Sequence, residues 1–391
     1  IYLDHAATTP LDPRVKKEMD SIKTYANPSA LHQMGLEAKE ILNNARNKVA
    51  KILNAEPEEI IFTSGGTESI NLAIKGIGKG HIITSKVEHP AVLETCKFLE
   101  RNGCNVSYLD VDKDGLISLK DLEKAIKKET ILITIMYANN EIGTIQPVKE
   151  ISKIAKKHKV PFHTDACQAG FLNLNINADL ITLNGSKIYG PKGIGILYKR
   201  KNIKLEPLMH GGGQEFNLRS GTENLTNIVG FAKALELAQK EDNNKITKLR
   251  DYFIQKVQKE IPRTFINGHK TKRLQNNANI SFLDVEGESI LLYLDHKGIL
   301  VSTGSACSSK KLEISHVLDA IGIKHDAAHG SIRFSLGKST TKIELDYVVK
   351  ELKGIIHSLR MLSPIHLNKG DIRKWKLSDI NKIKLGFIQA K

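Results

Sequence analysis

Cysteines and aromatic residues are scarce in this sequence, and long apolar runs are missing. Only four of the 391 residues are cysteines, and aromatic residues make up 5%. Four scattered cysteines are too few for a disulfide framework, and no pair has the C-x2-C spacing of a zinc site. No apolar run reaches the roughly 20 residues that span a bilayer, and the first residues lack the pattern of a secretion signal. We therefore expect a cytoplasmic protein with no membrane segment and no resident metal ion.

Basic residues outnumber acidic residues by 58 to 43, which gives a net charge of +15. Most lysines are single residues within helical patterns, which is typical of a solvated surface. The segment 366–391 is more basic, with seven Lys or Arg against two Asp. Two interpretations of this segment stay open: a plain soluble surface, or a basic docking surface for an acidic protein or tRNA.

Short β-branched runs alternate with longer amphipathic stretches, which is typical of a mainly parallel sheet covered by helices. Helices expected at 67–75, 90–102 and 148–158 fill connections between the strands. The sequence therefore predicts an α/β fold with a seven-stranded sheet. The strands expected are 59–63, 81–84, 105–109, 130–136, 160–164, 179–183 and 195–198.

The pattern changes after a long stretch, 228–259, that is expected to be helical. Strands and helices then mix over a shorter length, which indicates a smaller α+β domain. The first dozen residues are too short to fold alone and are expected to pack against it. The smaller-domain elements expected are strands 278–282 and 331–335 and helices 288–296 and 315–320. The predicted division is a large domain of residues 15–255, a small domain of residues 1–14 and 256–365, and a basic tail of residues 366–391.

A pair of glycines follows the first predicted strand and opens a helix, in the segment Thr63-Ser-Gly-Gly-Thr-Glu-Ser69. Gly65 and Gly66 permit a tight turn, and Thr67 lies where free amides and the helix dipole favour an anion. The segment predicts a phosphate site. A simple helix N-cap without a ligand is the alternative.

Asp165 and Lys187 each lie just beyond a predicted strand, separated by one crossover. Ligands of open α/β sheets bind at the carboxyl ends of strands. A lysine that loses its charge through desolvation can form a Schiff base there, and a neighbouring carboxylate can keep a pyridine nitrogen protonated. A structural ion pair between the two side chains is the alternative.

Three more polar residues, His89, Asn140 and Gln168, also follow predicted strands. An imidazole can stack on a flat ring and move protons near neutral pH. The amides of Asn140 and Gln168 can bind a ring oxygen or a substrate carboxylate. For His89 alone, a loop histidine with a structural hydrogen bond is the alternative.

Cys307 stands among small polar residues, 302–309, and we expect it on a mobile loop that reaches solvent, where its thiolate is available. The other cysteines are expected to be buried and inert. Arg333 lies in a predicted strand, and its planar guanidinium suits an α-carboxylate. A structural salt bridge is the alternative for Arg333.

Together these segments resemble the NifS/IscS-type cysteine desulfurases of the class V aminotransferase family, which are fold type I enzymes dependent on pyridoxal 5'-phosphate. The motifs occur in the family's order and cover about nine tenths of the chain. They are Tyr2-Leu-Asp-His-Ala-Ala-Thr-Thr-Pro10, Asn27-Pro-Ser29, Ser64-Gly-Gly-Thr-Glu-Ser69, Glu88-His89, Asn140-Glu-Ile-Gly143, Asp165-Ala-Cys-Gln168, Lys187-Ile-Tyr-Gly-Pro-Lys-Gly193, His210-Gly-Gly-Gly213, Arg219-Ser-Gly-Thr222, Gly304-Ser-Ala-Cys307 and Ile332-Arg-Phe-Ser-Leu-Gly337.

The resemblance implies a role for each candidate residue. Lys187 becomes the Schiff-base lysine, Asp165 the partner of the pyridine nitrogen, and His89 the acid/base that stacks on the ring. Arg333 and Asn140 become substrate-binding residues. The implied catalytic residues are Lys187, Cys307 and His89. The implied cofactor contacts are Gly66, Thr67, His89, Asn140, Asp165, Gln168, Asn184, Ser186, Lys187 and, from the second subunit of a homodimer, Thr222.

The resemblance also implies an activity. L-cysteine loses its sulfur to Cys307, which becomes a persulfide, and L-alanine is released. The persulfide then passes to an acceptor protein, either an iron–sulfur scaffold or a tRNA-modification partner. Cys307 can also ligate a cluster transiently on such a scaffold.

Two departures from the family pattern are visible. The family commonly has Ser-Gly-His-Lys before the cofactor lysine, whereas this chain has Asn184-Gly-Ser-Lys187, so an imidazole near the phosphate is lost. Asn and Ser still offer hydrogen bonds, and we expect cofactor binding to persist, more weakly. The segment after Pro364 does not match, which leaves the partner open.

Two other classes of function remain as alternative hypotheses. An aminotransferase or lyase of the same fold would share Lys187 and Asp165 but would have no use for Cys307. A basic scaffold that binds tRNA or an assembly protein, inactive because of Ser186, would be colourless when purified.

Overall fold

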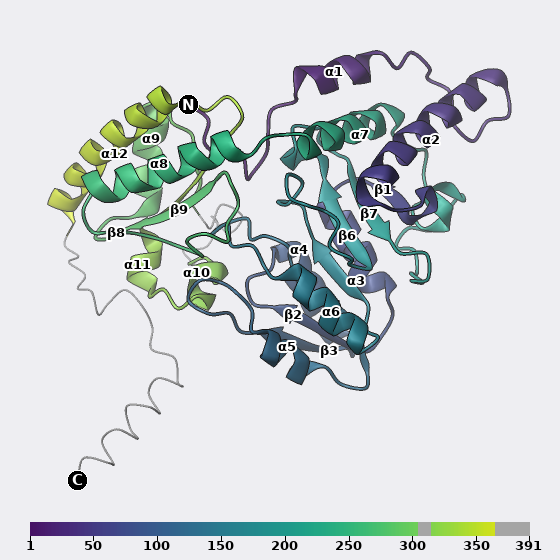
Figure 1. Ribbon diagram of the computed structural model, residues 1–391, viewed down its shortest axis with the longest axis horizontal. Coiled ribbons are helices and arrows are strands. Elements are labelled where there is room, and N and C mark those ends of the chain that lie inside the picture. Colours follow the sequence, from purple (N-terminus) through teal and green to yellow (C-terminus); the bar gives the residue numbers. More distant parts are fainter. Residues whose placement is uncertain (304–313, 364–391) are drawn as a thin grey trace, which may run out of the picture.

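The computed structural model describes residues 1–303 and 314–363. Figure 1 shows a large α/β layer system and, beside it, a smaller sheet covered by the helices α8, α9 and α12. The amino terminus lies with the smaller sheet, and the chain then runs to α1 on the large one. No helix in the described ranges has the length and apolar character needed to cross a bilayer.

The large sheet has seven strands in the order β1-β7-β6-β5-β4-β2-β3. Only β7 runs antiparallel to its neighbours, and the other pairings are parallel. The predicted fold, an α/β protein with a mainly parallel seven-stranded sheet, is therefore confirmed. The strands are β1 (Ile60–Thr63), β2 (His81–Ser85), β3 (Asn105–Leu109), β4 (Thr130–Thr134), β5 (Phe162–Asp165), β6 (Leu180–Asn184) and β7 (Gly195–Lys199).

Successive side chains of a strand point to opposite faces of the sheet, and each face of this sheet packs against helices. Ile83 and Ile133 contribute to one apolar cluster, while the preceding residues Ile82 and Leu132 contribute to another. The first cluster includes side chains of α2, α6 and α7, and the second includes those of α3 and α4. The helices of this part are α1 (Pro13–Asp20), α2 (Gln33–Leu53), α3 (Gly66–Gly76), α4 (Pro90–Arg101), α5 (Leu119–Ala125), α6 (Val148–Lys157) and α7 (Leu225–Gln239), with short 3-10 turns η1 (Pro57–Glu59), η2 (Gly185–Lys187) and η3 (Gln214–Asn217).

The smaller sheet is antiparallel, in the order β10-β9-β8, and has its own apolar core. Leu3 belongs to that core, and Tyr2 and Asp4 form bridges with Leu300 and Ser335. The first residues thus extend the smaller part of the molecule. Its elements are α8 (Asn244–Glu260), β8 (Thr264–Ile266), β9 (Asn277–Phe282), α9 (Gly287–His296), α10 (His316–Ala320), α11 (His325–His329), β10 (Ser331–Ser335) and α12 (Lys342–Leu362).

The stretch 228–259, expected to be continuously helical, is divided into α7 and α8. The break falls at Glu241-Asp-Asn-Asn244, where Asp and Asn favour caps and turns over helix interiors. The predicted domain boundary at residue 255 lies within α8, whose Phe253 and Val257 belong to the core of the smaller sheet. The domain division itself stays a prediction.

Candidate active site

The predicted phosphate segment lies between β1 and α3. Gly65 has φ 153°, a value that other residues rarely adopt, and α3 begins at Gly66. A Cβ atom on Gly66 would lie 2.6 Å from the Cys167 sulfur, so only glycine lets the helix start so close to the strand end. The first residues of this helix, whose amides have no acceptor within the helix, line a cavity of about 400 Å³. The cavity is lined by Ala7, Thr8, Ser64, Gly65, Gly66, Thr67, Glu68, Asn184, Ser186, Lys192 and Gly193.

Asp165 and Lys187 are placed beside this cavity by two neighbouring parallel strands. Asp165 ends β5, and Lys187 lies in η2 directly after β6. The Lys187 Nζ donates to the carbonyl of Ala6 at 3.1 Å and also to the carbonyl of Ala7, not to the Asp165 carboxylate. Burial lowers the pKa of Lys187. The lysine is therefore poised to exist as a free amine more readily than a surface lysine.

His89 caps the start of α4, where its Nδ1 accepts from the amide of Ala91 at 3.1 Å. Because Nδ1 is an acceptor there, the ring proton sits on Nε2. Burial lowers the pKa of His89, opposed by the negative charge of Asp165. His89 is therefore a neutral imidazole at neutral pH, and it lies close enough to Asp165 to feel its charge.

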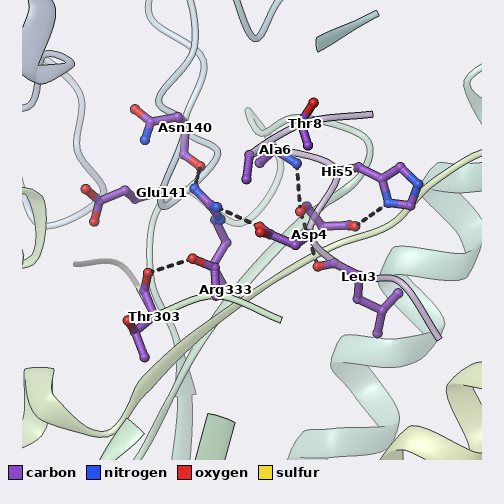
Figure 2. A network of polar contacts seen from close by, with 12 residues as sticks. Leu3, Asp4, His5, Ala6, Thr8, Asn140, Glu141, Thr303 and Arg333 are labelled. Atoms are coloured by element: carbon purple, nitrogen blue, oxygen red, sulfur yellow. Dashed lines mark hydrogen bonds and ion pairs between the residues drawn. The ribbon is translucent and has the colours of Figure 1, made fainter. Parts of the chain in front are cut away.

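Arg333 lies in β10 and is buried. Its Nη2 donates to the Asp4 carboxylate at 2.8 Å, and its Nη1 donates to the main-chain oxygen of Asn140 at 3.1 Å. Figure 2 shows the guanidinium between Asp4 and Asn140. The Nε of Arg333 is buried and has no hydrogen-bond partner among the residues that the structure describes. A salt bridge is thus present at Arg333, and a further donor is left for an anion.

The remaining predicted residues divide into two groups. Asn184 and Ser186 line the cavity, and the Asn184 Oδ1 accepts from both the amide and the hydroxyl of Ser186 at 3.2 Å. The Gln168 amide donates to the carbonyl of Ala6 at 2.9 Å. Thr222 is exposed and does not line the cavity within this single chain. Cys307 lies outside the described residues.

The first residues contribute more to the site than the sequence indicated, because we expected them only to pack against the smaller domain. Ala6 accepts from both Lys187 and Gln168, and Ala7 and Thr8 line the cavity. The amide of Thr9 donates to the carbonyl of Ser186 at 2.8 Å. Main-chain carbonyls leave no signal in a residue pattern, so only the Asp-His-Ala-Ala-Thr-Thr motif could have indicated this role.

Sequence reasoning also missed the part played by Glu88, next to His89. This carboxyl group is fully buried, and burial raises its pKa to about 8. It accepts from the Ser85 hydroxyl at 2.6 Å and from the amide of Met136 at 3.0 Å. Glu88 therefore connects the loop that carries His89 to Met136, which follows β4 and precedes Asn140 in the sequence.

The whole arrangement is that of a fold type I enzyme, with a cavity at a helix start and a half-buried lysine and a carboxylate at the carboxyl ends of neighbouring strands. The family model described as aminotransferase class-V matches residues 1–348. This chain therefore belongs to the class-V aminotransferase family.

The chain is similar over most of its length to several known proteins. The cysteine desulfurase IscS of Dictyoglomus turgidum is 52% identical, over 97% of this chain and 98% of the relative. A solved NifS-like protein is 40% identical, with a TM-score of 0.86, over 92% of this chain and 99% of that one. The structure of SspA in complex with cysteine is also 40% identical, with a TM-score of 0.77, over 86% of this chain and 98% of that one.

Pyridoxal 5'-phosphate is the cofactor of this family, and the residues present fit it. The helix start at Gly66 offers amides to the phosphate. Lys187 is half-buried with a lowered pKa, and Asp165 ends the strand next to the one that leads to Lys187. The Asn184 and Ser186 side chains line the cavity in place of the usual imidazole.

Proposed function

We propose that this chain is a cysteine desulfurase dependent on pyridoxal 5'-phosphate. The main support for the proposal is the half-buried lysine, Lys187, whose pKa is lowered beside a glycine-bounded cavity, in a chain with full-length desulfurase relatives. Gly66, Thr67, Asn184 and Ser186 would hold the phosphate. Thr222 of a second subunit would complete that contact.

The bound cofactor supplies an electron sink that acidifies the α-proton of an amino acid. Lys187 would hold the cofactor and would serve as the base for the α-proton. Asp165 would keep the ring nitrogen protonated, and its own position is fixed because its Oδ1 accepts from the amide of Cys167 at 2.9 Å. His89 would contact the ring and move protons through its Nε2.

Arg333 and Asn140 bind the substrate in this proposal. The Nε of Arg333, which is without a partner in the described part of the chain, is a buried donor that an α-carboxylate would satisfy. Asp4 and the carbonyl of Asn140 hold the guanidinium in one orientation. The substrate therefore meets a preformed cationic group, which limits the reaction to compounds with a free carboxylate.

Cys307 receives the sulfur. The Cβ–S bond of L-cysteine breaks, an S–S bond forms on Cys307, and the carbon skeleton gains protons and leaves as L-alanine. The sulfur is oxidised while the carbon is reduced, so no external oxidant is needed. A reduced thiol is required at the start of each cycle, which favours a reducing, cytoplasmic location.

The persulfide is passed to an acceptor protein for iron–sulfur cluster assembly or tRNA thiolation. Cys307 can also ligate a cluster on the scaffold for a short time. The basic segment 366–391, with seven Lys or Arg against two Asp, suits an acidic protein surface or tRNA.

We also propose a homodimer. Tyr25 and Leu31 are each 91% exposed in the single chain, and Met209 and Phe216 are exposed as well. Such apolar side chains are costly to leave in water and are typical of a protein interface. Thr222 lies in the same part of the sequence as Phe216, which is consistent with its reaching a second subunit's cofactor.

The proposal is tested by the products formed from L-cysteine. Under a reductant, the purified protein should release alanine and sulfide in equal amounts. Keto-acid formation without sulfide would show a transaminase instead. A protein without the visible absorption of the cofactor and without products would be the inactive scaffold.

A further inference from the structure

Glu141 is a buried carboxylate that joins the loop after β4 to the smaller sheet. Its amide donates to the Asn139 Oδ1 at 2.9 Å. Its carbonyl accepts from the side chains of Asn277 and Asn279 on β9, at 3.1 and 3.2 Å. Figure 2 shows Glu141 next to Asn140, whose own carbonyl accepts from Arg333. The main chain at Glu141 is therefore bonded both to its own loop and to β9 of the smaller sheet.

The side chain of Glu141 reaches a third part of the molecule. Its Oε2 accepts from the hydroxyl of Ser315, a residue 174 positions away in the sequence. Ser315 also caps α10, because its Oγ accepts from the amides of Val317 and Leu318 at 3.1 and 3.3 Å. One hydroxyl thus begins the helix and ties it to Glu141.

The next residue makes a second connection to the site. His316 donates from Nε2 to the carbonyl of Glu88 at 2.9 Å, and Glu88 precedes His89. Asn139, in turn, donates from its side chain to the carbonyl of Val87 at 2.8 Å. The loops that carry His89 and Asn140 are therefore joined to each other and to the start of α10.

Ser315 follows Cys307 by eight positions in the sequence. Cys307 lies outside the described residues, and the described chain resumes at residue 314, next to Ser315. Burial of Glu141 raises its pKa, while the hydrogen bond from Ser315 and the nearby Arg333 act in the opposite direction. The carboxylate thus lies near the proposed substrate-binding arginine and near the residues that follow the proposed sulfur carrier.

We propose that Glu141 is a positioning residue for sulfur transfer, acting through Ser315 to fix the chain that follows Cys307 to the loop that carries Asn140. This inference rests on the proposed function. Glu141 touches neither substrate nor cofactor in this role. Its effect should be confined to the step in which Cys307 accepts sulfur, and cofactor and substrate should still bind.

The test compares Glu141→Ala and Ser315→Ala with Glu141→Gln and Ser315→Thr. The alanine variants lose the shared hydrogen bond. Gln retains an acceptor oxygen, and Thr retains the hydroxyl. After mixing with one equivalent of L-cysteine, two signals are followed: the change in the cofactor's visible spectrum on substrate binding, and the persulfide on Cys307 by mass spectrometry.

The alanine variants should form the persulfide at least roughly tenfold more slowly, the order expected from losing one buried hydrogen bond to a charged group. Their cofactor content and substrate-induced spectral change should match wild type. The Gln and Thr variants should restore the rate. The double alanine variant should be no slower than the slower single variant, because both remove the same contact.

Ala320→Gly is the matched control, since it weakens α10 at its other end without touching Ser315. It should form the persulfide at the wild-type rate. Should Glu141→Ala fail to fold, Ser315→Ala and its Thr counterpart still decide the matter. Wild-type rates in the folded alanine variants, additive losses in the double variant, or an equal loss in Ala320→Gly would overturn the positioning role. A wild-type protein that forms no persulfide would instead overturn the proposed function.

Discussion

The Lys187 amine is held where its charged form is disfavoured. Burial lowers its pKa, and the Lys187 Nζ donates hydrogen bonds to the carbonyls of Ala6 and Ala7. Carbonyl oxygens stabilise an ammonium less than a carboxylate would, because they carry no net charge. The same amine is thus available both to hold a cofactor and to move a proton.

Replacing Lys187 by Ala should abolish covalent attachment of pyridoxal 5'-phosphate under borohydride reduction, because the only proposed attachment atom is removed. Mass spectrometry of the reduced peptides checks this. Lys192→Ala is the control, since Lys192 lines the cavity next to Lys187 but is exposed, and it should leave the adduct in place. An unchanged adduct in the Lys187 variant would refute the assignment.

Single residues at strand ends were predictable, whereas their partners were not. Asp165, Lys187 and Arg333 could be identified because polar residues directly after or within apolar strands are unusual. The partner of Arg333 is Asp4, which is 329 positions away in the sequence, and no local pattern connects them. The Ser315 contact of Glu141 is hidden for the same reason.

At the scale of elements, the start of α3 meets two structural conditions. The helix begins shortly after β1, and its first amides are available to bind an anion. Gly66 meets the first condition, because any side chain there would collide with Cys167. The glycine pair made the start of α3 predictable, since few other residues permit such a turn.

Other elements were less visible in the sequence. The three residues of β8 are half-buried and too few to show an alternating pattern. The gap between α7 and α8 was missed because the flanking apolar residues continue a helical period on either side. Tertiary contacts with two different cores separate these helices, and sequence periodicity does not report which core a residue joins.

The exposed apolar segments before α2 and around η3 give a prediction for assembly. Sedimentation equilibrium should give twice the chain mass of 43.4 kDa. Leu31→Glu should raise the dimer dissociation constant at least tenfold, because burial of one leucine contributes about 1.5–3 kcal/mol and counts twice in a two-fold dimer.

The control for this assembly test is Ile343→Glu on α12. Ile343 is also largely exposed, at 81%, but lies on the smaller part of the molecule. It should leave the dimer unchanged. Weakening by Ile343→Glu with no effect of Leu31→Glu would place the interface elsewhere.

At the scale of the whole molecule, the site lies where the large sheet, the smaller sheet and the first residues meet. Asp4 bridges to Ser335 of the smaller sheet and pairs with Arg333, while Ala6 and Ala7 bind Lys187 of the large part. Both sheets were predictable from periodicity. Their relative placement was not, because it depends on contacts between distant segments.

Arg333, the proposed substrate-binding residue, comes from the smaller sheet, and Lys187, the proposed cofactor lysine, follows a strand of the large sheet. Movement of one sheet against the other would therefore change the distance between substrate and cofactor. The short segment of the first nine residues limits that movement, since it bonds to both parts.

The most direct test of sulfur transfer is capture of the persulfide on Cys307. Wild-type protein would be mixed with one equivalent of L-cysteine without reductant, alkylated and digested, and the peptides weighed. We expect one added sulfur atom on the Cys307 peptide, equimolar with alanine. A Cys307→Ala variant that retains its cofactor should show neither alanine turnover nor added sulfur. Alanine formed at the wild-type rate by Cys307→Ala, or sulfur found only on Cys96, Cys104 or Cys167, would contradict this expectation.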